Sequence, residues 1–199
     1  YLSGHTQAVS FTDKAGITHM SKALPIGMGV FQGSALGPLL YCVFANDLSL
    51  FSADSDIIQY ADDTQVLVSG DKSSLPSLID RMETALASLD AWFRVNSLKV
   101  NADKTQLIVF GSRQNLRTFP LSNASVMFRD VRLEPCLEVK NLGVIFDSCL
   151  SWDKHISMVT RRCFGMMSGL SHLRHYLPEG VLSMLMSALV FSHVIYCLA

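Results

Sequence analysis

Two adjacent aspartates, Asp62 and Asp63, lie between two short β-forming runs in the stretch SDIIQYADDTQVLVSG. The runs, at residues 57–60 and 65–68, have the length of strands and are rich in apolar and β-branched side chains, which predicts a β-hairpin with both carboxylates at its turn. Two carboxylates held this close repel each other unless a cation neutralises them. Taken alone, the pair is equally well explained as a solvated turn, because Asp is a common turn residue.

The other hydrophobic patterns predict an α+β chain. Helical spacing of apolar residues alternates with β-forming runs, and residues 1–30 are expected to be extended or irregular. The expected helices are 36–48 and 75–93, the expected further strands are 104–110 and 139–147, and a short hairpin about Arg129 and Asp130 is expected at 126–133. Near Trp152 the spacing becomes helical again, with one helix to Tyr176 and another from Pro178 to the end. This order predicts an antiparallel sheet with helices on one face, followed by a purely helical part.

Composition narrows the class of protein. The 199-residue chain suits one domain with a sizeable core, and its net charge of −1 argues against a generally basic nucleic-acid binder. Residues 1–100 hold 6 Lys and Arg against 10 Asp and Glu, whereas residues 101–199 hold 10 against 7. This division suits metal binding in the first half and phosphate contact in the second. The five cysteines lack C-x-x-C spacing, which favours reduced thiols over disulfides or a zinc site.

The last 20 residues carry no formal charge and have the length that a membrane-spanning helix needs. Three serines and His193 interrupt this segment, and another amphipathic helix precedes it, so we expect a helix buried against a packing partner and no membrane insertion. The chain opens at Tyr1 without a signal peptide. An intracellular, non-secreted protein that is a fragment of a longer one is therefore expected.

Several longer motifs make the sequence similar to one enzyme family. The motifs are GVFQGSALGPLLY and QYADDTQVLV, followed in the family's order and spacing by LDAWFRVNSLKVNADKTQLIVFG, VKNLGVIFDSCLSWDKHI and LVFSHVIYC. Over essentially its whole length the chain resembles the reverse transcriptase of a non-long-terminal-repeat (LINE-type) retrotransposon. The resemblance implies an RNA-directed DNA polymerase that extends a DNA primer on an RNA template with deoxynucleoside triphosphates (dNTPs). It also implies a partial palm at residues 1–150 and the start of a helical thumb at residues 151–199.

The resemblance assigns roles to several residues. Asp62 and Asp63 are expected to hold two Mg²⁺ ions, or Mn²⁺ in their place, because nucleotidyl transfer uses two cations to activate the primer hydroxyl and stabilise pyrophosphate. Lys104 matches a lysine that protonates pyrophosphate, although a solvated lysine entering a strand explains it too. The residues expected to contact nucleotide or template are Gln32, Gly33, Ser34, Tyr60 and Ala61, and those expected to grip the primer are Leu142 and Gly143. For the Gln32 loop, a plain helix-capping loop is the alternative.

The sequence departs from the family pattern in three ways. Phe31 stands where proline is usual, and His5 stands where arginine is usual, which weakens a phosphate contact at neutral pH. The family's first catalytic carboxylate lies on a strand well upstream of Gln32, and none of the residues before Phe31 reads as that strand. Asp13 is too close to the loop to replace it. We therefore expect an incomplete metal site and no polymerase activity from the isolated chain.

Two functions of other classes stay open. A degenerate retroelement relic would act at most as a nucleic-acid-binding or partner-binding module. The basic residues of the expected thumb that would meet duplex phosphates are Lys154, Arg161, Arg162 and Arg174. A metal-dependent phosphoesterase would use the same carboxylate pair, but the sequence lacks the further His and Asp ligands that such sites recruit. For a working retroelement enzyme, a nuclear location is expected.

Overall fold

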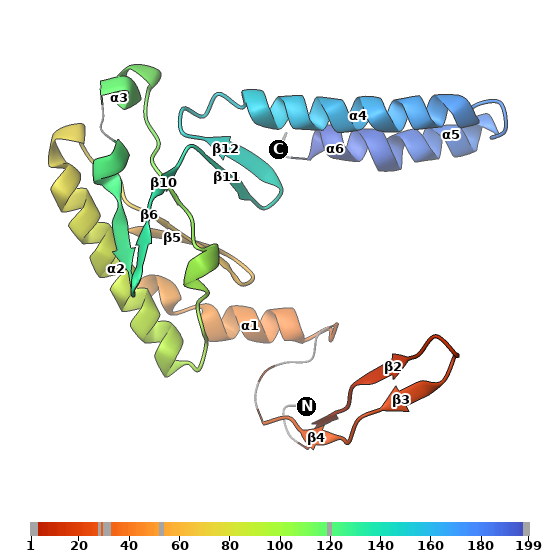
Figure 1. Cartoon of the computed structure of the whole chain (residues 1–199), viewed down its shortest axis with the longest axis horizontal. Coiled ribbons are helices and arrows are strands. Elements are labelled where there is room, and N and C mark those ends of the chain that lie inside the picture. Colours follow the sequence, from red (N-terminus) through yellow and green to blue (C-terminus); the bar gives the residue numbers. More distant parts are fainter. Residues whose placement is uncertain (1–3, 28, 30–32, 52–53, 119–120, 197–199) are drawn as a thin grey trace.

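The computed structural model describes residues 4–27, 29, 33–51, 54–118 and 121–196. It consists of an N-terminal pair of β-ladders, a central unit of strands and helices, and a C-terminal unit in which two helical segments lie antiparallel (Figure 1). This mixture confirms the predicted α+β class.

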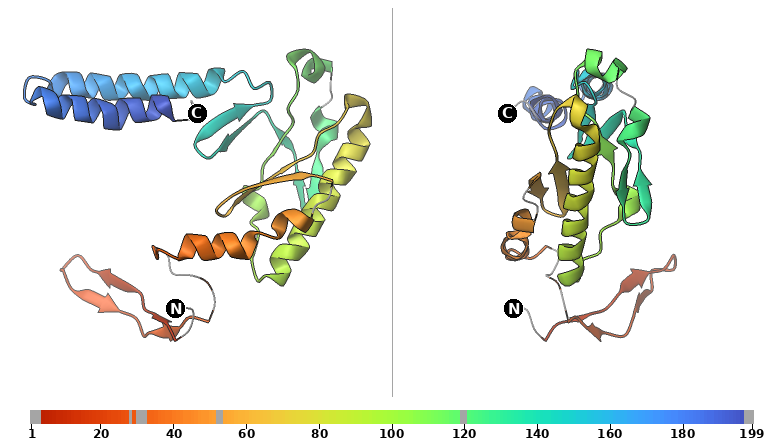
Figure 2. Two further views of the ribbon diagram at one scale, coloured as in Figure 1. Left: turned by 180° about the vertical axis from the view of Figure 1, so that it is seen from behind. Right: turned by 90° about the vertical axis from the view of Figure 1, so that its left-hand side faces the viewer.

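The N-terminal part is extended, as expected for residues 1–30. In it β1 (Thr6–Gln7) pairs with β4 (Leu24–Pro25), and β2 (Ser10–Thr12) pairs with β3 (Thr18–Met20), both antiparallel. The pair of ladders stands apart from the central unit in every view (Figures 1 and 2). Its apolar side chains are consequently exposed.

The central unit packs two helices against one β-hairpin. Its elements are α1 (Gly37–Ala45), η1 (Leu48–Phe51), β5 (Asp56–Tyr60), β6 (Asp63–Leu67), η2 (Lys72–Ser74) and α2 (Leu75–Val95). Leu48 and Trp92 are buried at the centre of the core, and Ile57 and Val66 of the hairpin pack against them. Because α1, α2 and the hairpin share this core, burial of the apolar side chains fixes the hairpin relative to α1.

Local chemistry sets the ends of the two helices. The backbone N–H of Gly37, the first residue of α1, donates a hydrogen bond to the Ser34 hydroxyl at 3.0 Å, and Pro38 lies in the first turn, where its missing N–H is tolerated. The expected helix at 36–48 is shorter than predicted, because the chain after Ala45 tightens into η1. Helix α2 begins directly after Ser74, at the predicted residue, and continues two residues beyond the expected end to Val95, with Asn96 as its C-cap.

The segment from 102 to 147 forms short paired strands. Its elements are η3 (Ala102–Lys104), β7 (Leu107–Ile108), α3 (Arg113–Thr118), η4 (Leu121–Ala124), β8 (Val126–Phe128), β9 (Val131–Leu133), β10 (Pro135–Cys136), β11 (Glu138–Asn141) and β12 (Val144–Asp147). The predicted single antiparallel sheet is wrong, since the strands within the described ranges pair only in twos and β7 pairs with β10 in parallel. The strand expected at 104–110 shrinks to β7. The β8–β9 hairpin between β7 and β10 brings the chain back in the same direction, and strands this short offer few backbone groups to a third neighbour.

An arginine joins the β8–β9 hairpin to α2. Arg129, at the hairpin turn, donates from Nε to Asp90 Oδ1 at 2.8 Å, pairs with the same oxygen through Nη2, and donates from Nη1 to the carbonyl of Val100 at 3.0 Å. The hydrogen bond from Arg129 is the largest cause that lowers the pKa of Asp90, and Arg94 adds a second ion pair. These contacts hold the hairpin against one side of α2.

The C-terminal unit has its own core. Its elements are α4 (Asp153–Leu173), α5 (Glu179–Leu185), the π-helix η5 (Met186–Phe191) and α6 (Ser192–Ile195). Cys163, Leu170 and Val190 are buried between the two helical segments. The helix expected from Pro178 onward is therefore interrupted by a π-helical stretch. Within the described part of the chain, no helix combines the length and the apolar character needed to cross a bilayer.

Asp147 organises the junction between β12 and α4. Its Oδ1 accepts hydrogen bonds from the backbone N–H groups of Cys149 and Ser151, both at 3.0 Å, and its Oδ2 accepts from the backbone N–H of Trp152 at 2.9 Å and from the Ser151 hydroxyl. The backbone hydrogen bond from Ser151 is the largest cause that lowers the pKa of Asp147, followed by those from Trp152 and Cys149. The carboxylate thus fixes how the helical unit leaves the central unit.

We expect Asp147→Asn to lower the melting temperature at pH 7, because an amide nitrogen cannot accept the hydrogen bonds that one carboxylate oxygen accepts. Because the pKa of Asp147 is lower in the folded state, its ionised carboxylate stabilises the fold at pH values above its ordinary pKa near 3.8. This contribution is lost as the pH falls through the folded-state pKa. The difference in melting temperature between wild type and variant should therefore narrow below pH 4. Asp153→Asn, at a position whose side chain is largely exposed, is the control. A gap that persists unchanged at low pH would contradict the role of the charge.

Candidate active site

The β5–β6 hairpin places the two aspartates at and beside a two-residue turn. Tyr60 and Asp63 are the last paired residues, so Ala61 and Asp62 form the turn. The predicted hairpin is confirmed, with the difference that Asp63 is the first residue of β6 and lies outside the turn. Ala61 has φ +52, a left-handed conformation that L-residues other than Asn and Asp seldom adopt. Such a φ matches a two-residue turn to the twist of the strands at the cost of about 1 kcal/mol of strain.

The two faces of the hairpin differ. Ile57 and Val66 are directly paired across the strands and face the central core. Because side chains alternate along a strand, the Tyr60–Asp63 and Ile58–Gln65 pairs lie on the opposite face. Tyr60 is 65% exposed on that face. Asp63 therefore projects onto an open, partly apolar surface, and Asp62 projects from its end.

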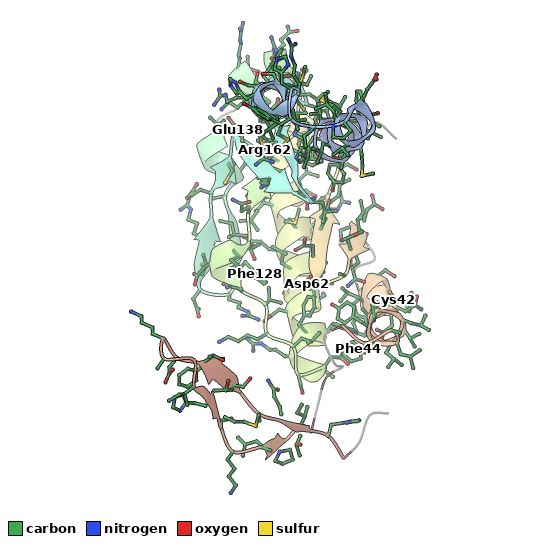
Figure 3. The ribbon with its side chains drawn as sticks, turned by 90° about the vertical axis from the view of Figure 1, so that its right-hand side faces the viewer. Cys42, Phe44, Asp62, Phe128, Glu138 and Arg162 are labelled. Atoms are coloured by element: carbon green, nitrogen blue, oxygen red, sulfur yellow. The ribbon has the colours of Figure 1, made fainter. Side chains whose placement is uncertain are left out.

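The environment of the tip is negative. No Lys, Arg or His forms an ion pair with Asp62 or Asp63 in the described part of the molecule. Burial, followed by the negative charges of Asp62 and Cys42, raises the pKa of Tyr41 on α1. The charge of Asp62 thus acts on the middle of α1, and Figures 1 and 3 show the hairpin tip alongside that helix.

A second hairpin gives a comparison for the solvated-turn alternative. In the β8–β9 hairpin the turn residues are Arg129, with φ +54, and Asp130, so Asp130 occupies the same position as Asp62. An aspartate there is thus an ordinary choice in this fold. The β8–β9 turn continues with Val131, whereas the β5–β6 turn continues with Asp63. The second carboxylate and the missing arginine are what distinguish the β5–β6 tip.

The tip supplies two oxygen ligands of the kind that Mg²⁺ and Mn²⁺ prefer. Both aspartates are exposed, so a cation would reach them without displacing a protein partner seen in the described residues. No group of three or more His, Cys, Asp or Glu side chains that would hold a metal ion is found among those residues. The residues present therefore fit part of a divalent-cation site, with the remaining ligands to come from water or a bound phosphate.

The loop before α1 is only partly visible. Gln32 and Phe31 lie outside the described residues. Gly33 has φ +80 and an exposed backbone, which lets the chain turn sharply into α1. Ser34 is half-buried, and its hydroxyl accepts the hydrogen bond from the backbone N–H of Gly37 at the start of α1. This contact agrees with the helix-capping interpretation for Ser34.

The other predicted residues belong to other elements than the β5–β6 hairpin. Lys104 ends η3 and is exposed. Asn101, whose Oδ1 accepts a hydrogen bond from the backbone N–H of Asp103, and Thr105 shape the η3 turn. Leu142 and Gly143 form the two-residue turn between β11 and β12, with φ +45 and +86. Within the described ranges, no hydrogen bond or ion pair links Lys104 or this turn to the aspartates.

The residues that hold these parts in place were not predictable from the motifs. Asp147, Arg129 and Tyr196 each make specific polar contacts that no motif indicated. Tyr196 donates its hydroxyl to the carbonyl of Leu142, 54 residues away in the chain, at 2.6 Å. The one local signal concerned Asp147, because an aspartate with a serine a few residues later, here Ser151, often forms hydrogen bonds within a loop.

Comparison with known proteins identifies the family. Residues 9–146 match the model of the family described as reverse transcriptase (RNA-dependent DNA polymerase). The chain is 34% identical over 152 residues to the probable RNA-directed DNA polymerase from transposon BS of Drosophila melanogaster, covering 73% of this chain and 16% of that protein. It is 29% identical over 148 residues to the polymerase from mobile element jockey of the same species, covering 71% of this chain and 15% of that protein.

A third relative extends the match. The probable RNA-directed DNA polymerase from transposon X-element, also of Drosophila melanogaster, is 29% identical over 167 residues, which cover 81% of this chain and 17% of that protein. No solved structure matches the chain significantly. The chain spans about a sixth of the length of these relatives. The family match and the mobile-element relatives confirm the resemblance found in the motifs: the chain belongs to the reverse transcriptase family.

Proposed function

We propose that this chain supplies the cation-binding hairpin and the adjoining helical unit of a polymerase that extends a DNA primer on an RNA template with dNTPs. The observation that supports this most is the pair of exposed carboxylates at and beside a strained turn, which form no ion pair within the described residues, in a chain that matches the reverse transcriptase family over residues 9–146. Asp62 and Asp63 would hold Mg²⁺, or Mn²⁺. When bound, the cations activate the primer hydroxyl and stabilise the departing pyrophosphate.

Roles for the neighbouring residues follow from their position. Tyr60 and Ala61 lie on the open end of the hairpin, where a base or sugar would rest against the aromatic ring. Gly33 leaves backbone accessible at the entry to α1. Gln32 and Ser34 belong to the same proposed nucleotide or template contact, with Ser34 acting through the start of α1.

The remaining assignments concern the primer and the leaving group. Lys104 would donate a proton to pyrophosphate, and the turn of Leu142 and Gly143 would contact the primer backbone. In this proposal residues 1–150 are part of the palm and residues 151–199 begin the thumb. A nuclear location is part of the proposal for the parent enzyme.

The isolated chain is expected to bind nucleic acid without extending it. Two carboxylates leave the two cations without a shared third ligand, so a primer-extension assay should give no Mg²⁺-dependent incorporation above background. Incorporation by the purified chain that disappears with Asp62→Asn would overturn this expectation and support a complete site.

A second function, a nucleic-acid-binding module without catalysis, is favoured by the basic face of α4. Lys154, Arg161 and Arg162 line a hollow beside β12. We expect the chain to bind a fluorescent RNA–DNA primer–template duplex with an affinity that falls as salt is raised, because phosphate contacts release counterions.

Fluorescence anisotropy with and without Mg²⁺ separates the two functions. A polymerase role predicts that Mg²⁺ strengthens duplex binding through Asp62 and that Asp62→Asn removes this gain. Binding that is salt-dependent and identical for wild type and Asp62→Asn would favour the non-catalytic module. Arg161→Ala should weaken binding in either case, since the neutralised phosphate is lost.

A further inference from the structure

The turn between β11 and β12 is held from outside the hairpin. The Tyr196 hydroxyl, at the end of α6, donates a hydrogen bond to the carbonyl oxygen of Leu142 at 2.6 Å. Both turn residues have positive φ, and Leu142 lacks the conformational freedom of glycine. A strained turn of this kind persists only when its surroundings fix it.

The aromatic ring of Tyr196 also packs on the turn. A Cβ added to Gly143 would lie 3.4 Å from Cε1 of the ring, which is van der Waals contact, so the ring lies directly against the backbone of the turn. Next to the turn, on β12, the backbone N–H of Ile145 donates a hydrogen bond to Nδ1 of His155 on α4 at 3.3 Å. Both segments of the C-terminal unit therefore contact the tip of one hairpin.

The π-helix determines which way Tyr196 faces. A π-helical turn holds an additional residue, and each residue corresponds to about 100° of rotation around a helix. Without η5, the residues of α6 would be rotated away from their present orientation. The buried thiol of Cys163 lies 3.8 Å from the carbonyl oxygen of Val190 inside η5 and gives this stretch a partner on α4. The segment that orients Tyr196 is thus built into the core of the C-terminal unit.

We propose that Tyr196 is a positioning residue: it fixes the Leu142–Gly143 turn relative to the C-terminal helices, so that a displacement of those helices moves the turn. The inference rests on the proposed function only where it assigns the turn to the primer. Tyr196 acts through the turn and touches no reacting atom in this account. The polymerase would thereby align the primer with the same helices that contact the duplex.

The contact lies at an accessible place. Tyr196 and Leu142 are both partly exposed, and a hollow of about 350 Å³, lined in part by Gly143, His155 and Arg162, adjoins them. Water can therefore replace a missing hydroxyl, and Tyr196→Phe should fold with an unchanged melting temperature. Tyr176→Phe is the matched control, because it makes the same chemical change in the same unit on a side chain that is 84% exposed.

Hydrogen exchange followed by mass spectrometry tests the contact itself. In Tyr196→Phe the backbone amides of residues 141–145 should exchange about fivefold faster, the factor expected for one lost hydrogen bond. The amides of α4 and the exchange of Tyr176→Phe should stay at wild-type values. Wild-type exchange at residues 141–145 in Tyr196→Phe would overturn the proposal, and so would a general acceleration in all elements.

Duplex binding tests the link to the primer. Tyr196→Phe should weaken binding of the RNA–DNA primer–template duplex about threefold, with Tyr176→Phe unchanged. Faster exchange at the turn with wild-type affinity would overturn the primer-positioning role. Should the wild-type chain fail to bind the duplex at all, the proposed function fails, while the exchange measurement still decides whether Tyr196 fixes the turn.

Discussion

Replacing Asp62 with Asn is expected to weaken Mn²⁺ binding by the chain about tenfold. The physical reason is charge: a hard cation binds to the summed negative field of both carboxylates, and a neutral amide removes half of it. With two ligands from the protein and the rest from water, the wild-type dissociation constant should lie in the range of weak sites, about 10⁻⁴–10⁻³ M. Isothermal titration calorimetry of wild type and variant measures both quantities.

The matched control is Asp130→Asn. Asp130 occupies the corresponding turn position in the β8–β9 hairpin and lies beside Arg129, so its loss should leave Mn²⁺ affinity unchanged. Equal weakening by Asp130→Asn and Asp62→Asn would mean that the cation senses only the general charge of the chain. Asp63→Asn should act like Asp62→Asn, and the double variant should abolish measurable binding.

Replacing Trp92 with Ala is expected to lower the free energy of unfolding by about 4 kcal/mol. The indole is 3% exposed and donates from Nε1 to Asp47 Oδ1 at 3.2 Å. It packs in a tilted arrangement against Phe44 and edge-to-face against Phe93, with ring centroids 5.7 and 5.3 Å away. The variant loses the buried surface and leaves a cavity between α1, α2 and the hairpin. Urea unfolding followed by circular dichroism gives the magnitude.

A nearby exposed residue supplies the comparison for this core prediction. Val95 lies one turn further along α2 and is 85% exposed, so Val95→Ala should change stability by less than about 0.5 kcal/mol. Trp92→Phe should fall between the two, because it keeps an aromatic ring and loses the bond to Asp47. A Trp92→Ala variant as stable as Val95→Ala would show that α1 and the hairpin do not share one core.

Local patterns in the sequence predicted the elements that local chemistry determines. The hairpin around Asp62 and the start of α2 at Leu75 each follow from spacing and propensity within a few residues. The family motifs added what periodicity lacks, namely a chemical reason for two neighbouring carboxylates. The sequence did not reveal that Asp63 begins β6 while Asp62 lies in the turn, because strand propensity does not specify the register of a hairpin.

Contacts between distant parts of the chain were not predictable in the same way. The parallel pairing of β7 with β10 depends on the path of the intervening hairpin, and neither strand is long enough to show a pattern. The Tyr196–Leu142 contact depends on a π-helical stretch whose apolar sequence looks like any helix. Lys104 was expected at the start of a strand and Leu142 within one, whereas the structure has the helical turn η3 and a two-residue hairpin turn at these positions. Propensity does not specify where a run of β-forming residues is interrupted by such a turn.

Paramagnetic relaxation by Mn²⁺ tests most directly whether the hairpin tip binds divalent cations. In two-dimensional NMR spectra of the chain at rising Mn²⁺, the amide signals of Tyr60 to Thr64 should broaden first, followed by those of α1 near Tyr41. Asp62→Asn combined with Asp63→Asn should leave these signals sharp at the same concentrations. Broadening that centres on other acidic residues, or that persists at the tip in the double variant, would contradict the account.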